Sequence, residues 1–200
     1  MIALIDYGAG NIFSVKNAFE NLNTEIILTD DKDTILAADK VILPGVGSFS
    51  DAIYNLKKRK LENTIIDLVD MGKPFLGVCV GLQLMFEHSE EGNVNGLGIF
   101  KGKIKKFPSE LCGKVPQIGW NGINIKDKSG IFKGVSDNFF YFVHSYYLET
   151  DENISAEAEY GLKYTCAYSH KNVDLVQFHP EKSGKTGLKL LGNFVNTRHL

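Results

Sequence analysis

The sequence predicts an α/β fold: a central, mainly parallel sheet flanked by helices, with antiparallel strands in the C-terminal half. First, short uninterrupted apolar runs alternate with segments of helical periodicity in the first half of the chain. This alternation is typical of parallel strands that are covered on both faces. Second, glycine-punctuated segments rich in Ile, Val, Tyr and Phe fill most of the second half, which is typical of antiparallel hairpins. Third, no linker or internal repeat divides the 200 residues, so we expect one domain over residues 1–200.

In the first half, we expect strands at residues 2–5, 26–28, 40–43 and 74–78. Apolar residues at helical spacing lie between them: Ile12, Val15, Phe19 and Leu22; then Phe49, Ala52, Ile53 and Leu56; then Leu61, Ile65, Leu68 and Val69. Gly72 follows the last set, where glycine favours the end of a helix. The segment 81–87 predicts the start of a further helix.

In the second half, the expected strand segments are 97–107, 115–125, 139–149, 154–160, 164–169 and 172–179. The chain then returns to helical spacing, with Leu188, Leu191 and Val195 on one face.

The charge balance and the cysteines limit the function classes. The chain has 22 basic and 24 acidic side chains, which gives no electrostatic basis for binding nucleic acid or a membrane surface. Its 3 cysteines lie far apart, and no signal peptide precedes the first predicted strand, so we expect a reducing cytoplasm. Cys112 and Cys166 have no base nearby in the sequence and are interpreted as structural.

No pattern for a metal or a nucleotide cofactor is present. The chain has neither a CxxC pair nor HExxH, so we expect no metal. Gly8 and Gly10 follow the first predicted strand, but Phe13 stands at the third glycine position of the dinucleotide-binding fingerprint. We therefore expect no cofactor.

The segment Gly77-Val78-Cys79-Val80-Gly81 has the form of a nucleophile elbow, with a cysteine between a predicted strand and a predicted helix. The two glycines permit a tight turn, and a following helix N-terminus stabilises a thiolate and offers a backbone N–H to an oxyanion. A buried cysteine in a strand is the alternative. These five residues alone leave both interpretations open.

Two further segments provide what such a nucleophile needs. His179 and Glu181 are two residues apart, so their side chains share one face of an extended chain and the carboxylate can orient the ring. Pro44-Gly45-Val46-Gly47 leaves the carboxyl end of a predicted strand, where ligands gather in α/β sheets. Taken singly, each segment could also be an ordinary turn.

Together these segments resemble the class I glutamine amidotransferase family, whose nucleophile, histidine and oxyanion motifs they match at residues 77–83, 177–181 and 44–47. Flanking segments at residues 6–11, 114–121 and 142–147 resemble the glutaminase subunits of a synthase in histidine biosynthesis. The resemblance covers essentially the whole chain. It implies a flavodoxin-like fold and glutamine hydrolysis without a cofactor.

The resemblance also implies roles for individual residues. Cys79 would attack the glutamine side-chain amide, His179 would act as base and acid, and Glu181 would orient His179. The backbone N–H groups of Val46 and Val80 would form the oxyanion hole. The residues that would hold glutamine are Gly45, Gly47, Gln83, His144, Ser145 and Tyr146.

The implied partner is a HisF-type cyclase subunit, a (β/α)8 barrel that forms a heterodimer with the glutaminase and receives its ammonia through a tunnel. Asn11, Trp120 and Lys182 would lie at that interface.

Phe13 and Gln117 depart from the pattern, on segments that we expect to face the partner. They leave open a glutaminase that supplies another synthase, such as one that amidates a surface sugar. A non-catalytic subunit that only binds a partner is a third hypothesis.

Overall fold

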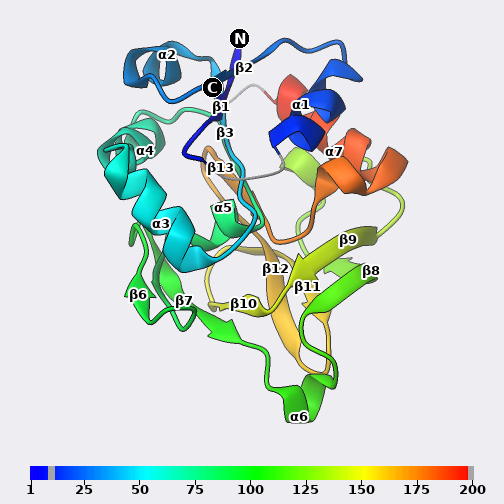
Figure 1. The fold of residues 1–200 in the computed structure, drawn as a ribbon. Coiled ribbons are helices and arrows are strands. Elements are labelled where there is room, and N and C mark those ends of the chain that lie inside the picture. The colour runs from blue at the N-terminus through cyan, green and yellow to red at the C-terminus, as the bar shows by residue number, and fades with distance from the viewer. Residues whose placement is uncertain (9–11, 198–200) are drawn as a thin grey trace.

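The structure is a computed structural model that describes residues 1–8 and 12–197 (Figure 1). The N-terminal elements are β1 (Ile2–Ile5), α1 (Ile12–Glu20), β2 (Ile26–Thr29), α2 (Lys32–Ala37), β3 (Lys40–Leu43), α3 (Phe49–Lys58), α4 (Glu62–Asp70), β4 (Phe75–Val78) and α5 (Val80–Gln83). The following strands are β5 (Phe86–Ser89), β6 (Val94–Asn95), β7 (Phe100–Lys106), β8 (Gln117–Ile125), β9 (Phe139–His144), β10 (Tyr146–Glu149), β11 (Ile154–Glu159), β12 (Lys163–His170) and β13 (Val173–Val176). The remaining helices are α6 (Ser109–Cys112), η1 (Gly130–Phe132), η2 (Pro180–Lys182) and α7 (Gly184–Asn196).

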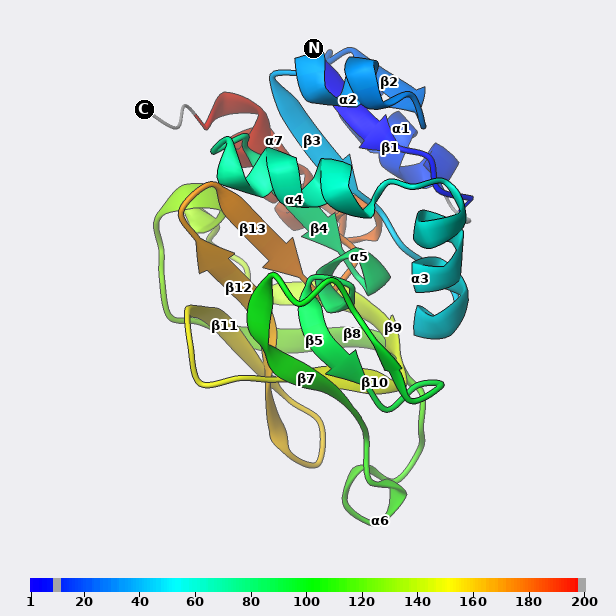
Figure 2. The same cartoon turned by 90° about the vertical axis from the view of Figure 1, so that its left-hand side faces the viewer.

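The parallel part of the sheet has the strand order β2-β1-β3-β4-β13. Every residue of β1, β4 and β13 is buried. The uninterrupted apolar runs of β1 and β4 predict this burial, whereas β13 also buries Asp174. Figures 1 and 2 show α2, α3 and α4 on one face of these strands, and α1 and α7 on the other. This is the flavodoxin-like order, in which ligands bind at the carboxyl ends of the strands.

The antiparallel part continues from β13 through β12, β10 and β7. Strand β5 pairs parallel with β7, and β6 closes this end of the path. Strands β11, β8 and β9 branch from β12. The fold class is therefore confirmed, as α/β with a mixed sheet.

Two local expectations are confirmed only in part. The segment 81–87 begins in α5 as predicted, but the helix ends at Gln83 and the chain enters β5 at Phe86. The segment 172–179 begins with β13, which pairs antiparallel with β12 but also parallel with β4. Helix α2 was not predicted; Asp31 caps it by accepting a hydrogen bond from the Thr34 backbone N–H. No helix within residues 1–8 and 12–197 is long and apolar enough to cross a membrane.

The topology brings four chain segments to one edge of the sheet. The carboxyl ends of β1, β3, β4 and β13 lead directly to Tyr7, Gly45, Cys79 and His179. Because these strands are parallel neighbours, residues far apart in the sequence meet at this edge.

Candidate active site

Cys79 lies in a sharp turn between β4 and α5. Its backbone has φ 55° and ψ −112°, a conformation that non-glycine residues rarely adopt. Its N–H donates to the Val176 carbonyl at 2.8 Å, so the neighbouring strand β13 holds the turn in place. Strained backbone of this kind costs roughly 1–3 kcal/mol and occurs mainly at functional sites. The elbow that the sequence predicts is therefore present.

The glycines around Cys79 are required because backbone segments approach each other closely. A Cβ on Gly81 would lie 2.0 Å from the Leu43 carbonyl oxygen, and one on Gly77 would lie 2.6 Å from Leu175 Cδ2. On Gly45, a Cβ would lie 2.6 Å from the Gly81 nitrogen. The elbow and the loop after β3 thus fit together only without these side chains.

We expect Gly81→Ala to destabilise the protein strongly, because its new methyl group would meet backbone that cannot rotate away. Overpacking of a filled interior costs roughly 1–3 kcal/mol, and more where backbone must move. Urea unfolding followed by circular dichroism would measure the change. Gly192→Ala is the matched control: its Cβ would lie 3.7 Å from Leu22 Cδ2, within α7. That variant should be neutral or slightly more stable, by up to about 1 kcal/mol. Equal stability of both variants would contradict the close approach at Gly81.

His179 and Glu181 form a buried pair beside the elbow. His179 Nδ1 lies 2.8 Å from Glu181 Oε1, and both side chains are almost fully buried. Two further bonds fix the backbone of His179: its N–H donates to the Tyr141 carbonyl at 2.9 Å, and its carbonyl accepts from the Ser183 hydroxyl at 2.6 Å. The ring is therefore held in one place.

The environment favours the protonated form of His179. Burial alone would lower the pKa of the ring. The negative charge of the Cys79 thiolate, a hydrogen bond to Cys79 and the bond to Glu181 outweigh burial, and the pKa of His179 is raised to about 10. His179 is therefore held as an imidazolium beside Cys79.

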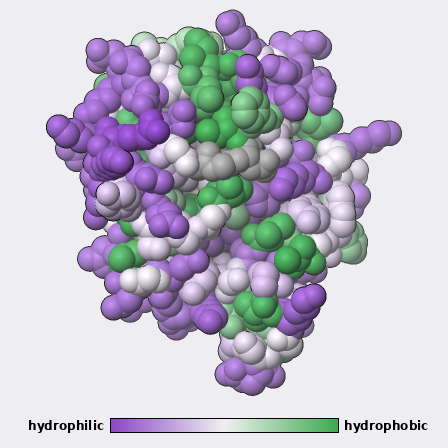
Figure 3. Space-filling view, in the orientation of Figure 1, coloured by the Kyte–Doolittle hydropathy of each residue, from purple (hydrophilic) through white to green (hydrophobic). Residues whose placement is uncertain are grey.

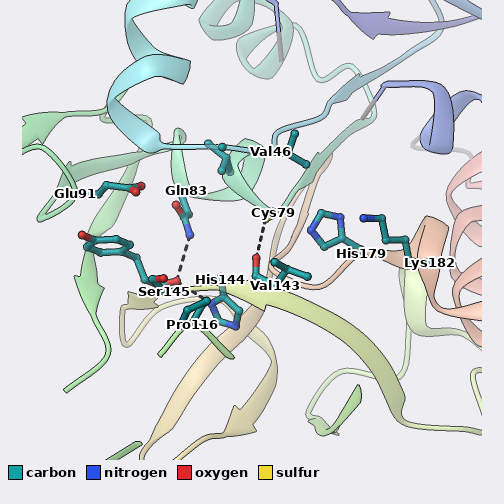
Figure 4. Close-up of a pocket in the computed structure, with 13 residues that line it drawn as sticks. Val46, Cys79, Gln83, Glu91, Pro116, Val143, His144, Ser145, His179 and Lys182 are labelled. Atoms are coloured by element: carbon teal, nitrogen blue, oxygen red, sulfur yellow. Dashed lines mark hydrogen bonds between the residues drawn. The ribbon is translucent and has the colours of Figure 1, made fainter. Parts of the chain in front are cut away.

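These residues open into a cavity of about 480 Å³, a size suited to a small ligand. Figure 4 shows Val46 on one side of Cys79, Val143 and His144 on the opposite side, His179 and Lys182 at one end, and Gln83 and Glu91 at the other. Ten residues that the sequence predicts for the site line the cavity: Val46, Gly47, Cys79, Val80, Gln83, His144, Ser145, Tyr146, His179 and Lys182.

The other predicted residues do not line the cavity. Gly45 lies beneath it against Gly81, and Glu181 lies behind His179. Trp120 is 57% exposed on β8, where its ring packs edge-on against Tyr141. Asn11 lies outside the described residues.

The order of the motifs along the chain agrees with a known family. A comparison with protein-family models matches residues 3–197 to glutamine amidotransferase class-I. The chain belongs to this family. Its elbow cysteine and buried His–Glu pair thus stand within an amidotransferase fold.

Individual relatives of this amidotransferase cover its whole length. It is 46% identical to the imidazole glycerol phosphate synthase subunit HisH of Methanocaldococcus jannaschii, over 98% of each chain. It is 48% identical to the HisH subunit of Methanosarcina mazei, over 97% of each chain. Among solved structures, a glutamine amidotransferase has a TM-score of 0.76 at 16% identity, covering 98% of this chain and 97% of the other. PurLQS of Thermotoga maritima has a TM-score of 0.73 at 20% identity, covering 98% and 97%.

His144 is neutral, so the amidotransferase has one charged histidine in its cavity. Burial lowers the pKa of His144 to about 4, a hydrogen bond to the Tyr146 carbonyl opposes this, and the nearby charge of His179 adds to it. The ring nitrogens lie 2.8 Å from the Tyr146 carbonyl oxygen and 3.1 Å from Gln117 Oε1.

Gln117 lies on a segment that we expect to face a partner, but its own side chain does not face outward. Its side chain is buried against His144 and Tyr164, because alternation along β8 turns Gln117 inward and Ile118 outward. Phe13, in contrast, is 77% exposed.

Sequence reasoning missed two residues near the site. Glu91 lines the cavity from the β5–β6 turn, where it also accepts the Phe49 N–H at 2.7 Å. Tyr7 is buried, and its hydroxyl donates to the Pro44 carbonyl at 2.8 Å, which ties the loop after β3 to the end of β1. Tyr7 falls in the segment 6–11 that carries the resemblance, whereas nothing around Glu91 in the sequence marks it.

Within residues 1–8 and 12–197, no group of three His, Cys, Asp or Glu side chains is placed to hold a metal ion.

Proposed function

We propose that this chain is the glutaminase subunit of an imidazole glycerol phosphate synthase, which hydrolyses glutamine and passes the ammonia to a HisF-type cyclase for histidine biosynthesis. The observation that carries the proposal is the strained Cys79 elbow beside the buried His179–Glu181 pair in one cavity. The full-length similarity to HisH subunits supports the pathway.

The reaction begins with Cys79 as the nucleophile and His179 as the proton donor. The Cys79 thiolate attacks the side-chain carbonyl carbon of glutamine and forms a C–S bond. The His179 imidazolium then gives its proton to the leaving nitrogen, the C–N bond breaks, and ammonia departs from a thioester. In the second half of the reaction, His179 takes a proton from water, which attacks the thioester and releases glutamate.

Three other features of the cavity suit this substrate. Val80 is the first residue of α5, so its N–H has no acceptor within the helix and is free to bind an oxyanion together with the N–H of Val46. Glu91 provides an anion in the cavity for the α-ammonium group of glutamine. Ser145 and Tyr146, with Gln83, bound the remaining wall.

A surface near the cavity suits a protein partner. Figure 3 shows green, apolar side chains on the face that carries β8 and β9, and the exposed apolar residues of these strands are Ile118, Trp120 and Phe139. Exposed aromatic residues of this kind are enriched at protein interfaces. We place the cyclase on this surface, with Trp120 and Lys182 in the interface, and the complex in the cytoplasm.

Glutamate release from glutamine tests the proposal, measured for the purified chain alone and with a HisF-type cyclase plus its ribonucleotide substrate. We expect turnover to rise roughly 10²–10³-fold in the complete mixture, because we infer that the loop at Val46 presents its oxyanion donor only when the partner is bound, and one such donor has an effect of this size. High turnover without the partner would contradict this control by the partner.

The same assay separates the alternative functions. A cyclase that works with free ammonia but does not stimulate this chain would favour another synthase, for which exposed Phe13 is the motivating residue. A chain whose Cys79 resists alkylation by a glutamine-analogue electrophile would be a non-catalytic subunit.

A further inference from the structure

We propose that Gln177, which begins the histidine motif but has no role assigned to it above, is a second catalytic hydrogen-bond donor to the sulfur of Cys79, in addition to His179. Its side-chain Nε2 donates to Cys79 Sγ at 3.6 Å. This proposal deepens the proposed function, on which its catalytic meaning rests.

The backbone places Gln177 where it can act. Gln177 and His179 are two residues apart just after β13, so their side chains share one face of the extended chain. The Gln177 N–H donates to the Cys166 carbonyl at 2.8 Å, and the side chain is fully buried. Both residues therefore approach Cys79 from the same strand end.

A hydrogen-bond chain fixes which end of the Gln177 amide faces the sulfur. The Tyr146 carbonyl can only accept, so the Gln83 amide must turn its Nε2 toward it, at 3.2 Å. The same Nε2 donates to Gln177 Oε1 at 3.0 Å. The oxygen of Gln177 is thereby committed to Gln83, and its NH₂ group is left to face Cys79.

This arrangement has a chemical consequence. A thiolate carries a full charge, and a hydrogen bond from a buried amide stabilises it relative to the neutral thiol. Gln177 is not part of the cavity wall, so it acts on the sulfur and not on glutamine. Since His179 loses its proton during turnover, Gln177 is the donor that stays beside the sulfur throughout the reaction.

Other titratable groups also face Cys79 or line its cavity. They are His179 and Glu181 after β13, Tyr7 after β1, His144 on β9, Glu91 in the β5–β6 turn and Lys182 in η2. The test must therefore compare variants in which all of these are unchanged.

The test is the pH dependence of Cys79 alkylation by iodoacetamide in the full chain, with the modified peptide identified by mass spectrometry. In Gln177→Met, we expect the midpoint to rise by about one pH unit, because a hydrogen bond to a charged group is lost. Gln177→Glu should raise it further, since a carboxylate repels the thiolate. Gln117→Met is the matched control: it removes another buried amide, one that contacts His144 and Tyr164 but not Cys79, and its midpoint should match the parent.

A midpoint unchanged in both Gln177 variants would overturn the proposal, since a merely structural glutamine affects stability and leaves the thiol titration alone. If neither variant folds, NMR of the unsubstituted chain decides. In a pH titration, the chemical shifts of the Gln177 side-chain amide protons should change with the same midpoint as Cys79 alkylation. Chemical shifts that stay constant through that midpoint would also overturn the proposed role of Gln177. Neither readout requires glutamine or a partner, so a chain that failed to hydrolyse glutamine would defeat the proposed function and leave this result standing.

In the complete synthase mixture, at a pH below the parent's alkylation midpoint, Gln177→Met should lower kcat for glutamine about tenfold and leave KM unchanged, because the fraction of thiolate falls about tenfold there.

Discussion

Cys79→Ala should reduce glutamine-dependent synthesis roughly 10⁴-fold or more, because removing a covalent nucleophile leaves only binding and oxyanion contacts. The other cysteines cannot replace it. The Cys112 thiol donates to the Tyr160 carbonyl at 2.8 Å, Cys166 is fully buried, and burial raises the pKa of both. The measurement is product formation by the chain with its cyclase, with glutamine as nitrogen donor.

Ammonia supplied directly provides the control for Cys79→Ala. With ammonium salts at alkaline pH, synthesis by the cyclase should proceed at the parent rate, because the variant chain still docks. Loss of both activities would instead indicate a damaged complex. Retention of glutamine-dependent synthesis would disprove thioester chemistry at Cys79.

Glu181→Gln should lower kcat/KM for glutamine by roughly 10²–10⁴-fold, as loss of the orienting carboxylate does in other triads. The substitution fits the space. Glu181 Oε1 bonds His179, whereas the buried Oε2 has no hydrogen-bond partner among the described residues, so an amide introduces no clash. The loss of activity would therefore come from the missing negative charge at residue 181 and from its effect on the tautomer of the His179 ring. Asp174→Asn, on β13 but bonded to Ser169, is the matched control and should stay within a few-fold of the parent.

The pH profile checks the cause of the Glu181→Gln effect. Glu181 is one of the groups that raise the pKa of His179, so its removal should shift the alkaline limb of kcat/KM to lower pH. Stability should follow the same sign. A folded-state pKa of about 10, above the unfolded value of about 6.5, stabilises the protein fully below pH 6.5, and this contribution is lost as pH rises through 10. In Glu181→Gln, this stability contribution should be lost at a lower pH than in the parent. Identical stability profiles for the two proteins would contradict the pairing of Glu181 with His179.

The sequence predicts the site better than it predicts the connections between elements. Cys79, His179 and the loop at Val46 each follow a strand, and the local sequence pattern predicts where strands end. It does not predict the position of β13 in the sheet, because long-range packing determines that β13 pairs with β4 and β12. Glu91 was missed for the same reason: only the fold of β5 and β6 brings its turn to the cavity.

The segment 81–87, which leaves α5 and enters β5, shows how tertiary packing overrides local periodicity. The apolar residues Leu82, Leu84, Met85 and Phe86 fit a helix as well as a strand, and all are buried. Burial on every side removes the amphipathic signal that distinguishes the two.

Strand β13 has a consequence for biosynthesis of the chain. It is the last strand to leave the ribosome, yet it fills the place between β4 and β12. Until residues 173–176 emerge, β4 is an open, wholly apolar edge, the kind of surface on which nascent chains aggregate. The same delay keeps His179 and Gln177 away from Cys79 during synthesis. Cys79 thus meets its base and its amide donor only once the sheet is closed, and an incomplete chain carries the cysteine without them.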